Sequence, residues 1–99
     1  MEKTFNRSFD VVFKRCKEAL EELELEIDSS SKAKGFIEAS TGSSFLSWGE
    51  DIEISIRSIS EKKTKVIVES SASAQVFSWG KNDSNESAII EKLTELLAQ

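Results

Sequence analysis

The stretch that decides the fold is EDIEISIRSISEKKTKVIVESSASA, residues 50–74. Isoleucine alternates with polar residues in its first part, and valine resumes the alternation after a polar segment at residues 60–64. The apolar positions are Ile52, Ile54, Ile56, Val66 and Val68. A period of two is typical of a strand with one buried face, so the stretch predicts two antiparallel strands joined by a short turn.

The length of this turn predicts how the two strands pair. A loop over residues 60–64 places Ile56 near Val68 and Ile52 near Ala72. A slip of one residue would move every side chain to the other face of the sheet. Ile59 breaks the alternation, which predicts a β-bulge or an early strand end near residues 57–58.

A short strand and a helix are predicted ahead of the hairpin. Residues 2–7 predict a strand centred on Phe5, and Ser8 and Asp10 suit the N-cap and the first turn of a helix. The apolar residues of this helix form a stripe with the spacing of four helical turns, which consists of Phe9, Val12, Phe13, Cys16, Ala19, Leu20 and Leu23. Val11 lies outside this stripe and is therefore expected on the surface.

The period changes from helix to strand near Leu23. Leu23, Leu25 and Ile27 alternate with acidic residues, which predicts a strand that lies at one edge of the sheet, guarded by its charges. The alternative continues the helix to Ile27, which would place Leu25 on the charged side. A polar turn over residues 29–34 then leads to a strand over residues 36–41.

A final helix is predicted to begin near Asp83, because Asp83 and Glu86 have the spacing of a capping box. Its apolar stripe is Ile89, Ile90, Leu93, Leu96 and Leu97. The element order is therefore β-α-β-β-β-β-α, and the short loops predict an antiparallel sheet with two helices packed on one face. The predicted class is α+β, in a single domain over residues 1–99.

This element order resembles the β-α-β4-α arrangement of TATA-binding-protein-like and helix-grip domains. The resemblance covers the whole chain and rests on topology. It implies either a small apolar ligand held between sheet and helix, as in helix-grip relatives, or DNA gripped by the sheet. The chain is shorter than usual ligand-binding helix-grip proteins, and it is acidic where a DNA saddle would be basic. The Trp-Gly-Lys-Asn segment at residues 79–82 is also similar to small uncharacterised prokaryotic domains, which brings no function with it.

Composition narrows the classes of function. The net charge is −5, and short basic clusters at residues 14–17 and 62–65 are flanked by acids, so neither a nucleic acid nor an anionic membrane is the expected partner. The first residues lack the apolar run of a signal peptide or a membrane span. A single cysteine, Cys16, suits a reducing compartment, so we expect a cytoplasmic protein.

Two similar hexapeptides flank the hairpin and contain both tryptophans, FLSWGE at residues 45–50 and VFSWGK at residues 76–81. The hairpin brings Trp48 and Trp79 to the same end of the sheet. The rings either cap the open end of the core or form an aromatic surface for a ligand or peptide, near Asp51. The candidate binding residues are therefore Trp48, Gly49, Glu50, Trp79, Gly80 and Lys81.

A second candidate is a face of small residues. Ser70, Ala72 and Ala74 share one parity, with Ala39 on the preceding strand. Small side chains beneath a helix indicate either close helix–sheet packing or a cavity of the helix-grip type.

Residues that could carry catalysis are few. Cys16 lies on an apolar stripe and is expected to be buried and inert. The sequence contains no histidine, which excludes Cys-His and Ser-His mechanisms and histidine metal sites within this chain. The carboxylate pairs Glu50–Asp51 and Asp83–Glu86 are the remaining candidates for acid–base chemistry or a hard cation, and solvated loop charges explain them more simply.

Together these patterns predict a non-catalytic binding or interaction module with no cofactor and no metal. Its site is expected at the Trp48/Trp79 end of the sheet, its partner is a protein or a small molecule, and the chain is a monomer or a weak homodimer. The alternative is a helix-grip-type protein that binds a small apolar ligand in a cavity between sheet and helices. A carboxylate-based enzyme is the third hypothesis.

Overall fold

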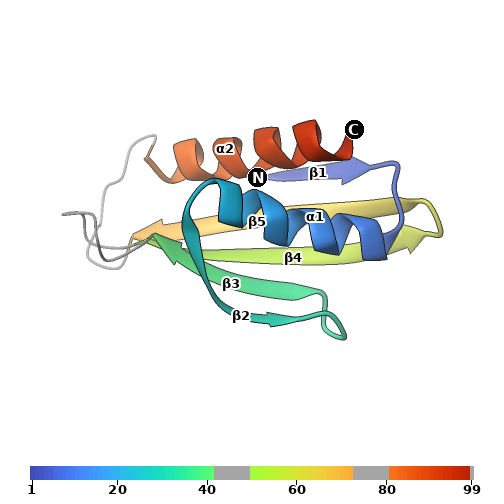
Figure 1. The fold of residues 1–99 in the computed structure, drawn as a ribbon, viewed down its shortest axis with the longest axis horizontal. Coiled ribbons are helices and arrows are strands. Elements are labelled where there is room, and N and C mark those ends of the chain that lie inside the picture. Colours follow the sequence, from blue (N-terminus) through green and yellow to red (C-terminus); the bar gives the residue numbers. More distant parts are fainter. Residues whose placement is uncertain (42–49, 73–80, 99) are drawn as a thin grey trace.

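Five strands and two helices make up the described part of the protein, which is residues 1–41, 50–72 and 81–98 of a computed structural model (Figure 1). The elements are β1 (Glu2–Phe5), α1 (Phe9–Glu22), β2 (Leu25–Ser31), β3 (Phe36–Thr41), β4 (Glu50–Ser60), β5 (Lys63–Ala72) and α2 (Lys81–Leu97). The sheet is antiparallel with the strand order β1-β5-β4-β3-β2, and both helices pack on one face. The predicted α+β class and element order are confirmed.

β4 and β5 form the central hairpin. The residues that lie opposite each other include Ile52 and Ser70, Ile54 and Val68, and Ile56 and Val66. The predicted pairs, Ile56 with Val68 and Ile52 with Ala72, are wrong by two residues. Because the shift is even, each side chain stays on its predicted face, and the three isoleucines of β4 at positions 52, 54 and 56 are buried.

A tight turn explains the different register. Ser60 pairs with Lys63, so the turn has two residues where the sequence predicts a loop over residues 60–64. The register shifts between Ser58 and Ser60, which makes Ile59 the extra residue of a β-bulge. Ile59 is 54% exposed. The bulge predicted from Ile59 is therefore confirmed, one residue further along the strand.

The first helix follows its sequence pattern. The Ser8 hydroxyl accepts a hydrogen bond from the backbone N–H of Val11 at 3.5 Å, and Asp10 lies in the first turn. Val11 is exposed, as predicted. The buried residues of α1 are Val12, Phe13, Cys16, Ala19 and Leu20, with Phe9 and Leu23 partly buried against the same core.

Glu24 ends the helical region. Its φ of 62° lies in the left-handed region that residues other than glycine rarely adopt, and it follows directly after the cap of α1. The chain then enters β2, with Leu25 and Ile27 partly buried against the core. The predicted strand is confirmed, and the alternative helix through Ile27 is wrong.

β2 is longer than the sequence predicts. A register shift after Ile27 lets the strand continue to Ser31, so the predicted polar turn over residues 29–34 shrinks to residues 32–35. Gly35 closes this turn with φ 64°, and its carbonyl accepts a hydrogen bond from the N–H of Ile56 at 2.7 Å. A Cβ on Gly35 would lie 2.3 Å from the backbone oxygen of Ile56, so only glycine fits.

α2 begins at Lys81, two residues before the predicted start at Asp83. The capping role predicted for Glu86 is wrong, because the earlier start places Glu86 in the second turn. Its carboxylate instead accepts hydrogen bonds from the backbone N–H and the hydroxyl of Ser70, both at 3.2 Å, and lies 3.0 Å from the α-amino group of Met1. These contacts tie α2 to the sheet.

Among the described residues, large aliphatic side chains fill the space between the sheet and the helices. Those that are fully buried are Leu20, Ile37, Ile52, Ile54, Ile89, Leu93, Val12, Val66 and Val68. The predicted stripe of α2 is confirmed, since Ile89, Ile90, Leu93, Leu96 and Leu97 are all buried. Among the described residues, neither helix is long and apolar enough to cross a membrane.

Candidate functional site

The chain leaves the sheet twice at the same end. Glu50, the first residue of β4, pairs with Ala72, the last residue of β5, and β3 ends at Thr41 on the same side (Figure 1). Residues 42–49 link β3 to β4, and residues 73–80 link β5 to α2. The sheet therefore anchors both tryptophan-containing segments at one end.

The predicted site itself falls largely in these two segments. Trp48, Gly49, Trp79 and Gly80 lie outside the described residues, whereas Glu50 begins β4 and Lys81 begins α2. The binding site therefore stays a prediction. The described residues near it show which charges lie at this end of the sheet.

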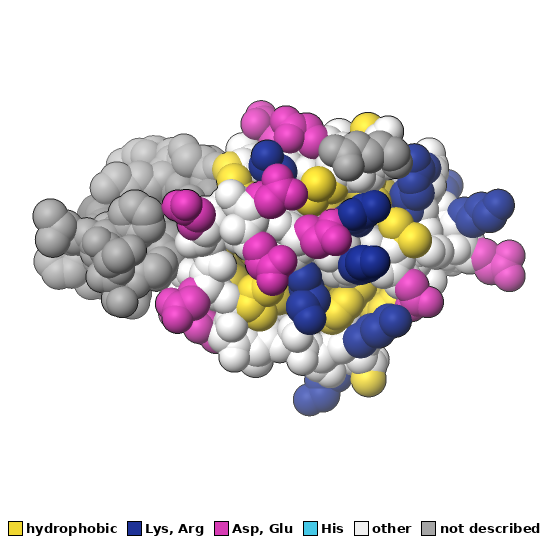
Figure 2. Space-filling model, in the orientation of Figure 1, with side chains coloured by type: hydrophobic (Ala, Val, Ile, Leu, Met, Phe, Trp, Pro, Cys, Tyr) yellow, Lys and Arg dark blue, Asp and Glu magenta, His cyan; other side chains and the backbone are white. Residues whose placement is uncertain are grey.

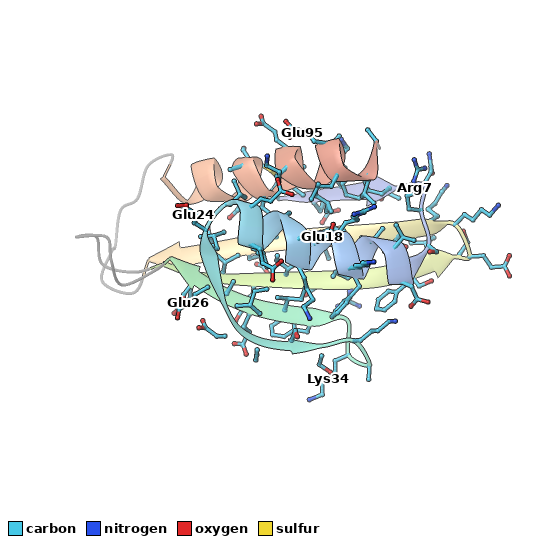
Figure 3. All side chains as sticks on the ribbon, viewed as in Figure 1. Arg7, Glu18, Glu24, Glu26, Lys34 and Glu95 are labelled. Carbon is cyan, nitrogen blue, oxygen red and sulfur yellow. The ribbon has the colours of Figure 1, made fainter. Side chains whose placement is uncertain are left out.

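Several exposed side chains near this end of the sheet are acidic. Glu24, Glu26 and Asp51 are exposed near this end, and none of the three forms an ion pair with a described residue. Figure 3 shows Glu26 beside the ends of β3 and β4, and Glu24 at the turn between α1 and β2. Figure 2 shows acidic side chains mostly on the half of the visible face near this end, and Lys and Arg mostly on the other half.

The small-residue face is partly described. Ala39 is 1% exposed and belongs to the hydrophobic core, and Ser70 is bonded to Glu86. Ala74 lies outside the described residues. These contacts show close packing at Ala39 and a polar contact between sheet and helix at Ser70, while the ligand-binding cavity of the alternative hypothesis stays a prediction.

Cys16 is buried in the core, as predicted. Burial raises the pKa of its thiol from the ordinary 9.0 to about 12. Since the thiolate is the reactive form, this thiol is inert at neutral pH.

Of the two candidate carboxylate pairs, the structure describes the side chains of Asp51 and Glu86. Glu86 is 12% exposed and is engaged by Ser70 and Met1. Among the residues that the structure describes, no group of three or more His, Cys, Asp or Glu side chains is arranged to hold a metal ion.

The sheet face opposite the helices, here called the open face, carries charges in an ordered pattern. Residues that lie opposite each other on neighbouring strands share a face, so the register defines rows across the sheet. An acidic row contains Glu38, Glu53 and Glu69, a central row contains Phe36, Ser55 and Ile67, and a basic row contains Arg57 and Lys65.

A surface pocket lies beside the basic row on the β3–β4 side of the open face. Its volume is about 340 Å³, and it is lined by Lys34, Gly35, Phe36, Ser55 and Arg57. Two cationic side chains next to an aromatic ring suit a carboxylate that carries an apolar stem.

No protein-family model matches the chain, and no curated protein matches it.

The sequence contained a signal for the open-face rows. The polar positions of β4, Glu53, Ser55 and Arg57, alternate with buried isoleucines and therefore face away from the helices. Their neighbours on β3 and β5 could be assigned only with the correct register, and the predicted register was two residues out.

Proposed function

We propose that the protein is a non-catalytic binding module that uses the Trp48/Trp79 end of the sheet to bind a basic segment of another protein. One observation carries the proposal. Two tryptophan-containing segments are anchored at a single end of a well-packed sheet, and three exposed carboxylates near that end form no ion pair with a described residue.

The partner chemistry follows from this combination of side chains. Indole rings attract Lys and Arg through cation–π contacts, and tryptophan is enriched at binding hot spots. The exposed carboxylates of Glu24, Glu26 and Asp51 complement the same cations and repel acidic partners. An aromatic surface with acids at its rim therefore suits a segment that carries Lys or Arg.

The described framework next to the candidate site is firmly packed. Ile52 is fully buried two residues after Glu50, and the Glu86–Ser70 hydrogen bonds hold the second turn of α2 against β5. A preorganised framework reduces the entropy cost of binding.

The non-catalytic part of the proposal is supported by the state of the one thiol. Cys16 is buried and protonated, and Glu86 is committed to structural hydrogen bonds. A lone buried cysteine also agrees with a reducing compartment, so we place the protein in the cytoplasm. Fractionation of cells that express a tagged chain tests this location, and recovery outside the cytoplasm would contradict it.

Tryptophan fluorescence tests the binding proposal directly, because the sequence has only two tryptophans and both lie at the candidate site. We expect caesium to quench the emission more strongly than iodide, since acidic neighbours attract the cation. A peptide that alternates lysine with leucine should shift the emission in a saturable way, and a matched glutamate–leucine peptide should not. Blue-shifted emission that neither quencher reaches would contradict the proposal.

Variants separate binding from folding. Trp79→Ala should abolish the response to the lysine–leucine peptide and change the free energy of unfolding by less than about 0.5 kcal/mol, as for a surface residue. Asp51→Asn with Glu26→Gln should weaken the same binding, and Glu21→Gln on the exposed side of α1 is the matched control. A loss of about 3–5 kcal/mol in Trp79→Ala would instead assign the ring to the core.

A further inference from the structure

We propose that two copies of the chain associate through their open faces, as a twofold-symmetric dimer in which the acidic row of each copy covers the basic row of the other. The proposal uses the rows at positions 53, 55 and 57 of β4, and it does not depend on the proposed function.

The open face of a single copy sets like charges side by side. Glu53 lies directly opposite both Glu38 and Glu69. Like charges opposite each other on neighbouring strands destabilise a sheet. Glu38 accepts a hydrogen bond from Ser29, and neither Glu53 nor Glu69 forms an ion pair with a described residue.

The basic row has the same character. Arg57 lies directly opposite Lys65, and Lys34 lines the same pocket as Arg57. Lys65 contacts Glu2 at 3.0 Å, whereas Arg57 and Lys34 have no ion-pair partner among the described residues. Like charges repel each other within each row. Contact between the acidic row of one copy and the basic row of the other would compensate this repulsion.

Geometry allows this compensation in one orientation. Glu53 and Arg57 are four residues apart on β4, which corresponds to about 14 Å along the strand, and Ser55 lies midway. A twofold axis that runs across the strands along the central row reverses the strand direction and keeps the order of the strands. Glu53 then faces Arg57 of the second copy, and Glu69 faces Lys65.

The other orientation is excluded by charge. A twofold axis parallel to the strands would place acidic row on acidic row and basic row on basic row. The charge pattern therefore selects a single isologous arrangement, in which every contact occurs twice.

The centre and the pocket fit the same arrangement. Phe36 and Ile67 are only partly buried. The axis brings Phe36 toward Phe36 of the second copy and Ile67 toward Ile67 of the second copy, which supplies an apolar centre. The pocket of about 340 Å³ beside Lys34 and Arg57 lies where Glu38 and Glu53 of the second copy would enter. Packed sheets are separated by about 10 Å, a gap that long charged side chains can span from both sides.

Sedimentation velocity at low ionic strength tests the dimer. We expect the wild-type chain to shift from monomer to dimer over a concentration series that reaches about 1 mM, which populates a dimer with a Kd in that range. High salt should weaken the association, because it screens partly exposed charges. A wild-type chain that stays monomeric throughout the series would overturn the proposal and leave the open face to another partner.

Charge reversal tests the pairing itself. Arg57→Glu and Glu53→Arg should each raise the dimer Kd by at least about tenfold, because each creates two like-charge contacts. An equimolar mixture of the two variants should form heterodimers, since every reversed contact is then matched. Two variants that dimerise like wild type, or that stay monomeric when mixed, would overturn the proposed arrangement.

Controls keep folding separate from association. Lys14→Glu and Glu21→Arg make the same changes of charge on exposed positions of α1, and they should leave the dimer unchanged. Circular dichroism and thermal melting of each variant verify the fold. If the two control variants also abolish the dimer, net charge and not the open face determines association, which would contradict the proposal.

Discussion

Replacement of Ile54 by alanine tests the core and the strand register together. Ile54 is fully buried in β4 and lies opposite Ile37 on β3 and Val68 on β5, both of which are also fully buried. The substitution removes three methyl or methylene groups. At about 0.8 kcal/mol for each buried group, the lost transfer free energy alone is about 2.4 kcal/mol.

The cavity adds to this loss. Paired strands enclose the site on both sides and the helices cover it, so the surroundings can collapse only partly. We therefore expect the free energy of unfolding to fall by about 3–5 kcal/mol, toward the upper part of the range for isoleucine truncations. A domain of this size unfolds with roughly 5–15 kcal/mol, so the loss is a large fraction of the total stability and should be easy to measure.

Urea unfolding followed by circular dichroism measures the loss. With an m value near 1.5 kcal/mol per molar urea, the midpoint should fall by roughly 2–3 M. Ser55→Ala is the matched control, because Ser55 is the next residue, lies half-buried on the opposite face and should change stability by less than about 0.5 kcal/mol. Equal midpoints for the two variants would refute the assignment of faces.

Three further substitutions test particular contacts. Gly35→Ala should lose more than about 2 kcal/mol, because the new Cβ meets the backbone oxygen of Ile56, and Ala33→Ser in the same turn should lose less than about 0.5 kcal/mol by urea titration. Glu86→Gln should lose about 1–3 kcal/mol through weaker hydrogen bonds to Ser70, and an unchanged melting temperature would contradict that role. Cys16 should resist thiol reagents until the chain unfolds. Because burial raises the pKa of Cys16 to about 12, the native state holds this proton more tightly than the unfolded chain, so stability should fall as pH rises from 9.0 toward about 12. This fall should be steeper than in Cys16→Ala by up to about 1.4 kcal/mol per pH unit, and parallel curves would contradict the argument.

The regular parts of the fold could be predicted because each carries a local period. The stripe from Phe9 to Leu23 and the alternation from Ile52 to Ile56 are one-dimensional patterns, and burial in the structure follows both. The capping hydroxyl of Ser8 and the exposure of Val11 belong to the same local information.

The errors arose where the structure depends on turns or on distant contacts. A polar run at residues 60–64 does not show that only two residues form the turn, so the predicted register was two residues out. Glu86 has a capping spacing to Asp83, yet its partners Ser70 and Met1 lie 16 and 85 residues away. No local pattern contains such contacts.

The tryptophan end and the open face differ in the same respect, because only the first was predicted from local sequence patterns. The two similar hexapeptides at residues 45–50 and 76–81 predict that Trp48 and Trp79 act together. The structure places the strand ends that anchor both segments at one end of the sheet. The charge rows of the open face were not predicted, because Glu38, Glu53 and Glu69 become neighbours only through the register of three strands.

The pairing of β1 with β5 has a consequence for synthesis on the ribosome. Glu2 pairs with Ile67, so β1, which is translated before β5, waits until β5 emerges before it can join the sheet. β5 carries Val66 and Val68 and would otherwise present an unpaired edge that recruits strands from other nascent chains. Because β1 is already translated at that point, it is available to pair with this edge as soon as β5 emerges.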